Sequence, residues 1–139
     1  MEKFIVTAAL PYANGPIHIG HIAGAYLPAD IFVRYQKLKK NDVIFVCGSD
    51  EHGAAITLRA KKENTTPQKI IDLYHEKNEK SFKSLNINFS IYHRTSSKLH
   101  HDTAQIFFKT LHEKNVFKKK YSKQFFDEEN NQFLADRYI

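Results

Sequence analysis

The sequence predicts an α/β fold in which helices flank a parallel sheet. Two continuous apolar runs, at residues 4–9 and 43–48, are typical of buried strands, and a long amphipathic segment at residues 18–39 lies between them. A strand, a helix and a second strand in this order form a parallel crossover unit. The chain has 139 residues, of which 42% are hydrophobic, so it is long enough to bury the core of one modest domain.

The first helix is predicted from about residue 18 to residue 39. Its apolar side chains recur at helical spacing, on a face formed by Ile22, Tyr26, Ala29 and Val33. Pro28 lies inside this helix, where it removes a backbone hydrogen bond to Gly24 and crowds the preceding turn. The sequence therefore predicts a kink at Pro28.

Two further helices and a third strand are predicted after the second strand. A short helix covers residues 54–62, and Thr66 and Pro67 are typical of the N-cap and the first position of the next helix. The buried face of that helix is expected to contain Ile71, Tyr74, Phe82 and Leu85. Residues 87–93 alternate in part between apolar and polar side chains, which predicts the third strand.

One more helix is predicted near the end of the chain. It begins at a cap, Ser96 or Ser97, and continues to Lys114. Its apolar side chains are Leu99, Ile106, Phe107 and Leu111. The residues from Val116 onward have a β-like composition.

The most informative segment is residues 11–21, where a glycine-marked turn leads from the first strand into a helix. The first N–H groups of a helix have no partner within it, so they attract anions such as phosphate. His18 and His21 lie on one face of the first helical turn and can follow one ligand, and Gly20 would let a flat ring such as adenine approach the backbone. The alternative is that the two histidines only cap the helix or pack against it.

The stretch from Thr7 to His21 resembles the His-Ile-Gly-His signature region of the class I aminoacyl-tRNA synthetases. Isoleucyl enzymes share the Pro-Tyr-Ala-Asn-Gly turn that precedes this signature, so the second strand is needed to distinguish them. That strand ends in the sequence Ser-Asp-Glu-His-Gly at residues 49–53, which resembles the methionyl-tRNA synthetase family. The similarity continues to residue 138 and covers essentially the whole chain.

This resemblance implies that the chain is the N-terminal portion of a longer synthetase. Residues 1–115 would be the first half of a Rossmann-like class I catalytic domain, and residues 116–139 would begin the connective insertion that carries a zinc knuckle. The sequence contains neither the second signature, Lys-Met-Ser-Lys-Ser, nor the Cys-x-x-Cys pairs of the knuckle. We therefore expect no metal ligands in this chain, zinc only in a full-length protein, and no catalysis by the 139 residues alone.

The resemblance also implies an activity and a set of site residues. The family activates L-methionine with ATP and Mg²⁺ to methionyl-adenylate, and it transfers the methionyl group to tRNA(Met). His18 and His21 would be catalytic. The residues expected to bind ATP are Asn14, His18, Gly20 and His21. The residues expected to bind methionine are Ala9, Leu10, Tyr12 and Asp50, and Asp50 would accept the α-amino group. The roles of Glu51 and His52 stay unassigned.

Charge and composition agree with this interpretation but do not require it. The formal net charge of +6 suits anionic partners such as ATP and tRNA. A single cysteine, Cys47, and the lack of a long apolar run predict a cytoplasmic protein that has no membrane partner. His100 and His101 are expected on the surface without a metal, because adjacent helical positions point about 100° apart.

Other interpretations remain open. The chain could be a short split or degenerate synthetase paralogue that acts as a binding module, with the remainder of the synthetase on a separate chain. It could also be another adenylate-forming nucleotidylyltransferase, since small enzymes of that class carry a His-x-Gly-His turn. Asp50 could serve only as a cap for the helix that follows it.

Overall fold

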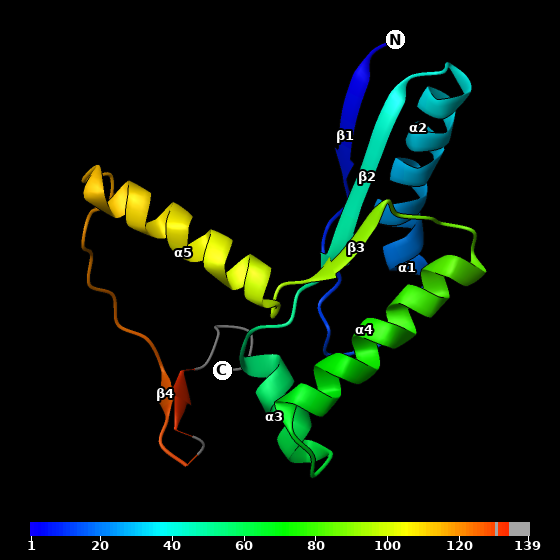
Figure 1. Ribbon diagram of the computed structural model, residues 1–139. Helices are drawn as coiled ribbons and strands as arrows, with labels where there is room; N and C mark the ends of the chain where they lie inside the picture. The colour runs from blue at the N-terminus through cyan, green and yellow to red at the C-terminus, as the bar shows by residue number, and fades with distance from the viewer. Residues whose placement is uncertain (130, 134–139) are drawn as a thin grey trace.

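The computed structural model describes residues 1–129 and 131–133. At its centre lies a three-stranded parallel sheet, with the strands in the order β1-β2-β3 (Figure 1). These strands are β1 (Lys3–Thr7), β2 (Asp42–Ser49) and β3 (Ile91–Arg94). Helices flank the sheet, so the predicted fold class is confirmed.

One long helical stretch connects β1 with β2. It consists of α1 (Ile19–His21), the π-helical segment η1 (Ile22–Tyr26) and α2 (Leu27–Leu38). At the end of η1 the Leu27 N–H bonds to the Ile22 carbonyl, the wider spacing of a π-helix. Pro28 follows directly, in the first turn of α2, where a missing N–H is tolerated. The structure has a π-helical segment just before this proline, and the kink at Pro28 stays a prediction.

The remaining helices are α3 (Ala54–Lys62), α4 (Pro67–Ser84) and α5 (Lys98–Glu113). Thr66 caps α4 and Ser97 caps α5, because each side-chain oxygen accepts a backbone N–H of the first turn, at 3.3 and 3.2 Å. The predicted cap at Thr66 is confirmed, and Ser97 rather than Ser96 is the cap of α5. The β-like pattern after residue 115 yields one short antiparallel pair, β4 (Phe126–Asp127) and β5 (Gln132–Phe133).

The main core lies between one face of the sheet and the helices α2 and α4. Its buried side chains are Ile22, Tyr26, Val33, Val43, Phe45, Cys47, Phe82 and Ile87. Tyr26 of η1 and Phe82 of α4 pack edge to face, with their ring centroids 4.6 Å apart. The opposite face of the sheet exposes Ile5, Ile44 and Ile91, and α5 projects away from the sheet on this side (Figure 1).

The third strand begins later than predicted, at Ile91 instead of residue 87. The reason is the way in which α4 ends. Asn86 adopts a left-handed conformation with φ 62°, and the Ile87 N–H bonds back to the Phe82 carbonyl at 3.0 Å. This closure keeps Ile87 in the core beneath the helix, so the chain joins the sheet only after it.

The apolar faces of α4 and α5 also differ from the prediction. Leu85, predicted on the buried face of α4, is 52% exposed, whereas Ile70 and Asn78 are buried. In α5 the whole predicted face is exposed, namely Leu99, Ile106, Phe107 and Leu111. Among the described residues, none of the helices has both the length and the apolar character needed to cross a membrane.

Candidate functional site

The candidate site lies where the strands end, at the carboxyl edge of the sheet. The chain that leaves β1 pairs once more with the end of β2, through an isolated parallel bridge between Tyr12 and Asp50. The Asp50 N–H donates to the Pro11 carbonyl at 2.9 Å, and the Ala13 N–H donates to the Asp50 carbonyl at 2.8 Å. Two of the predicted methionine-binding residues, Tyr12 and Asp50, are thereby held side by side.

His18 and His21 form a reciprocal cap at the start of α1. The Nδ1 atom of His18 accepts the Gly20 N–H at 3.1 Å, and the Nδ1 atom of His21 accepts the His18 N–H at 3.2 Å. Their ring centroids are 3.9 Å apart. Since both Nδ1 atoms act as acceptors, each neutral ring must carry its proton on Nε2. Both side chains are exposed, so the cap leaves two Nε2–H donors open to a ligand.

Gly20 has a structural role that the sequence argument did not foresee. A Cβ atom at this position would lie 3.0 Å from Cε1 and 3.1 Å from Nδ1 of the His18 ring. The absent side chain therefore makes room for the imidazole of His18 itself. Whether a ligand ring also approaches this backbone stays a prediction.

Two side chains that the sequence argument missed hold the turn before His18. Asn78 of α4 is fully buried, its Oδ1 accepts the Ile17 N–H at 3.1 Å, and its Nδ2 donates to the Gly15 carbonyl at 3.4 Å. Arg59 of α3 donates from Nη1 to the carbonyl of Asn14. Each contact spans more than forty positions of sequence, so no local pattern could have indicated it.

The predicted methionine-binding residues are only partly gathered in one pocket. Leu10 lines a pocket of about 500 Å³ between the open face of the sheet and α5, together with Cys47, Ile91 and Leu99. Ala9, Tyr12 and Asp50 do not line it. Among the described residues, no hydrogen bond or ion pair engages the carboxylate of Asp50, which is half-buried. That carboxylate is therefore available to a ligand.

Cys47 is buried behind the segment that leaves β1. Its Sγ lies 3.7 Å from the Ala9 carbonyl oxygen and 3.9 Å from that of Ala8. Burial raises the pKa of the Cys47 thiol to about 11, against a smaller opposing effect of the Gly48 backbone. The thiol therefore stays protonated near neutral pH and supports the backbone rather than acting as a nucleophile.

A buried charge cluster, centred on Glu51, fixes the end of β2. The Glu51 side chain has no exposed surface, and Arg94 at the end of β3 donates from Nε to both of its oxygens, at 2.8 and 2.9 Å. Ser49 donates to Oε1 at 2.7 Å, and Ser96 donates to Oε2. The Glu51 N–H donates to the Thr95 hydroxyl at 2.9 Å. The cluster thus ties β2 to β3 directly beside Asp50.

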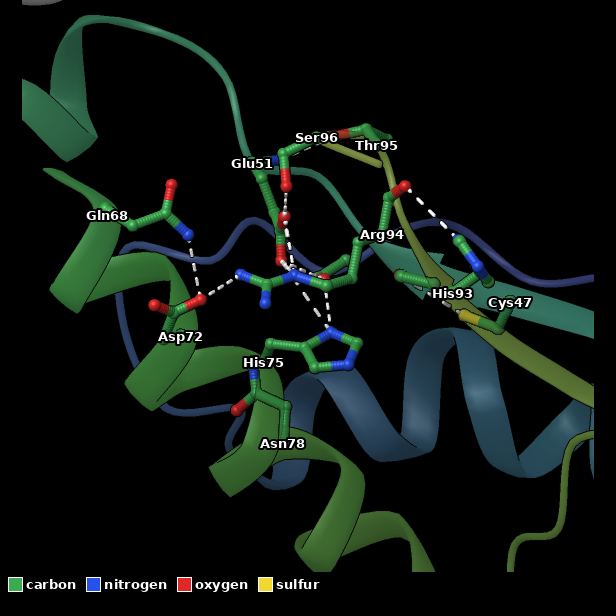
Figure 2. Close-up of polar contacts among 12 residues, drawn as sticks. Cys47, Glu51, Gln68, Asp72, His75, Asn78, His93, Arg94, Thr95 and Ser96 are labelled. Carbon is green, nitrogen blue, oxygen red and sulfur yellow. Dashed lines mark hydrogen bonds and ion pairs between the residues drawn. The ribbon is translucent and has the colours of Figure 1, made fainter. Parts of the chain in front are cut away.

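Helix α4 contributes further members to the Glu51 cluster, and Figure 2 shows Gln68, Asp72, His75 and Asn78 along one side of that helix. Asp72 Oδ1 forms an ion pair with Nη2 of Arg94 at 2.6 Å, and Nδ1 of His75 lies 2.6 Å from the Ser49 hydroxyl. Burial alone would raise the pKa of Asp72, but hydrogen bonds from Arg94 and Gln68 outweigh it and lower the pKa. Burial, reinforced by the positive charge of Arg94, lowers the pKa of His75.

His52 lies outside the Glu51 cluster and meets α5 instead. Its Nε2 is 3.2 Å from Nε2 of His101 and 3.4 Å from the carbonyl oxygen of Thr95. His100 and His101 are exposed, as predicted. In the described ranges, no group of three or more histidine, cysteine or acidic side chains is placed to hold a metal ion.

Comparisons with known proteins agree on one family. A family model described as tRNA synthetases class I (M) matches residues 4–139. The methionine–tRNA ligase of Bacteroides fragilis is 63% identical over 138 residues, and that of Chloroherpeton thalassium is 55% identical. Each alignment covers 99% of this chain but 20% of the relative. The chain therefore spans about a fifth of the length of these curated relatives.

Two solved structures share the fold. A Mycobacterium tuberculosis methionyl-tRNA synthetase, determined in complex with methionyl-adenylate, superposes with a TM-score of 0.81 at 23% identity, over 99% of this chain and 27% of that one. An Agrobacterium radiobacter LeuRS, in a ternary complex with tRNA and LeuAMS, gives a TM-score of 0.82 at 26% identity, over 97% of this chain and 18% of that one. Both have the fold of the class I synthetases. Their names give different amino acids, methionine and leucine.

Proposed function

The chain belongs to the class I tRNA synthetases of the methionyl group, and on this premise we propose that it forms part of an enzyme that activates L-methionine with ATP and transfers it to tRNA(Met). One observation carries the proposal. The segment that leaves β1 presents two histidine donors, and the same segment is bridged at Tyr12 to Asp50, whose carboxylate is available, at the neighbouring strand end. Because the chain spans about a fifth of its relatives, the remainder of the synthetase would complete the site.

The turn after β1 would bind the nucleotide. His18 and His21 present Nε2–H donors at the start of a helix, where the backbone also favours negative charge. Asn14 and Gly20 would contribute from the same turn. ATP would arrive with Mg²⁺ on its phosphates as part of the substrate. The donors would stabilise the charge that develops on the α-phosphate, and the loss of one such donor commonly costs about 100- to 1,000-fold in rate.

The end of β2 would bind the amino acid. A partly buried ammonium group needs a carboxylate partner, and Asp50 offers one that no side chain within the described residues already engages. Tyr12 is held beside Asp50 by the backbone bridge, and Ala9 and Leu10 lie on the segment between β1 and that bridge. Together these residues would form one wall of the methionine site.

The proposed chemistry needs no covalent enzyme intermediate. The methionine carboxylate attacks the α-phosphorus of ATP, the bond from that phosphorus to the bridging oxygen breaks, and pyrophosphate leaves with the electron pair. The adenylate then passes the methionyl group to a ribose hydroxyl of tRNA(Met), and AMP leaves. Positioning and charge stabilisation account for catalysis of this kind. Zinc has no candidate ligand group within the described residues, so we assign no step to it.

Methionine-dependent exchange of labelled pyrophosphate into ATP tests the proposal on the full-length protein. We expect exchange with L-methionine and none with leucine, the amino acid named by one structural relative. The His18→Ala, His21→Ala double variant should lose at least about 100-fold of the exchange rate. Exchange driven by leucine or by a pantetheine-like acceptor would instead support another adenylate-forming enzyme. The isolated 139 residues should show no exchange above the double variant.

A further inference from the structure

The fully buried amide of Asn78 has both ends committed to one short segment of backbone. Its Oδ1 accepts the Ile17 N–H at 3.1 Å, and its Nδ2 donates to the Gly15 carbonyl at 3.4 Å. A buried amide is costly unless it is hydrogen-bonded, and both ends of this amide find their partners in the turn. Asn78 lies on α4, more than sixty positions along the chain from the turn that it contacts.

The same turn receives a second support from α3. The guanidinium of Arg59 donates to the Asn14 carbonyl, stacks 4.6 Å above the ring of Tyr74 and pairs with Glu63 at 2.6 Å. A Cβ atom on Gly15 would lie 3.2 Å from Nη1 of Arg59, so the glycine also gives this guanidinium room. The backbone groups of three turn residues are therefore fixed from outside, immediately before His18.

We propose that Asn78 is a positioning residue for the nucleotide, acting through the turn at residues 14–17. The next residue, His18, is the cap that fixes both imidazole tautomers, so a displaced turn would move both Nε2–H donors at once. This inference rests on the proposed function, because the donors are taken to face ATP. Asn78 itself has no contact with the nucleotide in this account.

The placement of Asn78 on α4 makes the expected effect selective. Asp72 and His75, earlier on the same side of α4, hold the Glu51 cluster beside Asp50 (Figure 2), whereas the side-chain hydrogen bonds of Asn78 go to the turn after β1. One helix thus supports the two halves of the candidate site through different side chains. A change at Asn78 should therefore disturb the turn after β1, which would bind the nucleotide, and leave in place the end of β2, which would bind the amino acid.

Kinetics of pyrophosphate exchange by the full-length protein test this selectivity. Asn78→Leu keeps the branched shape of the side chain with bulkier terminal groups and removes both hydrogen bonds, and it should lower kcat/KM for ATP by about 100-fold while the KM for methionine changes less than about twofold. Asn78→Asp retains an acceptor for Ile17 and should lose less. Phe82→Leu on the same helix is the matched control, since it weakens the core, against which the Ile17 side chain also packs, but removes no hydrogen bond to the turn.

Amide hydrogen exchange supplies a readout that does not depend on activity. In the full-length protein, Asn78→Leu should speed exchange in peptides that contain Ile17, and Phe82→Leu should not do so at equal global stability. If both KM values rise by the same factor in Asn78→Leu, or if Ile17 stays protected, the positioning role is wrong. If the wild type lacks methionine-dependent exchange but Ile17 loses protection in Asn78→Leu, the proposed function fails while the support of the turn by Asn78 stands.

Discussion

The two strand ends that form the candidate site are held by different kinds of interaction. The turn after β1 is held mainly by neutral hydrogen bonds, from Asn78 and from the histidine cap, and its donors are exposed. The end of β2 is held by the Glu51 cluster, in which a carboxylate without exposed surface pairs with Arg94. The loss of one neutral hydrogen bond costs less than the loss of one partner of a buried ion pair, because a charge left alone in the interior is expensive. We therefore expect substitutions in the two regions to lower stability by different amounts.

The largest expected effect is at Glu51. Glu51→Ala removes the buried carboxylate that both Nε of Arg94 and the Ser49 and Ser96 hydroxyls contact, and leaves Asp72 as the one remaining acidic partner of Arg94 among the described residues, so we expect a loss of about 3 kcal/mol in the free energy of unfolding. Glu63→Ala, which breaks the exposed pair with Arg59, is the control and should cost about 1 kcal/mol or less. Urea denaturation of both variants measures the difference. Equal losses would mean that burial does not distinguish the two ion pairs.

A smaller effect is expected where β2 and β3 approach closely. A Cβ atom on Gly48 would lie 2.3 Å from the His93 carbonyl oxygen, so Gly48→Ala must push the strands apart and should cost about 1–3 kcal/mol. Gly24 lies in η1, on the helical stretch that follows the turn after β1. A Cβ atom added to Gly24 would have no neighbouring atom within 4 Å. Gly24→Ala should therefore be neutral or slightly stabilising. Thermal unfolding of both variants checks this, and a destabilised Gly24→Ala would contradict it.

The smallest effect concerns pH and arises from His75, beside the end of β2. The pKa of His75 lies below its ordinary value of 6.5 in the folded protein, so the unfolded chain binds this proton more readily. Its contribution to stability is complete above pH 6.5 and is lost as the pH falls through the lower folded pKa. His75→Gln should flatten the dependence of unfolding free energy on pH below about 6.5. An unchanged slope in this variant would assign the dependence to other groups.

The local parts of this architecture could be predicted from the sequence, and the parts that depend on distant contacts could not. The first two strands, the Thr66 cap and the histidine turn follow from neighbouring residues. Arg94 meets Glu51 43 positions away, and Asn78 meets Ile17 61 positions away, so their roles required the fold. Leu85 was misplaced because the left-handed closure at Asn86 ends α4 before that residue reaches the core.

Helix α5 illustrates a different limit. Its amphipathic pattern predicts the helix correctly, but its apolar face is exposed because nothing among the described residues covers it. A hydrophobic pattern indicates that a face suits burial and does not identify the partner. In contrast, α4 finds its partners in the sheet, and its polar side chains Asp72, His75 and Asn78 connect the two strand ends.

The central claim is that the end of β2 binds the amino acid while the turn after β1 binds the nucleotide. The most direct test is the pair of KM values in methionine-dependent pyrophosphate exchange by the full-length protein with Asp50→Asn. Loss of the carboxylate that faces an ammonium should raise the KM for methionine by roughly 30-fold or more, while the KM for ATP stays within about twofold. An unchanged KM for methionine, or an equal rise in both values, would contradict this division of the site.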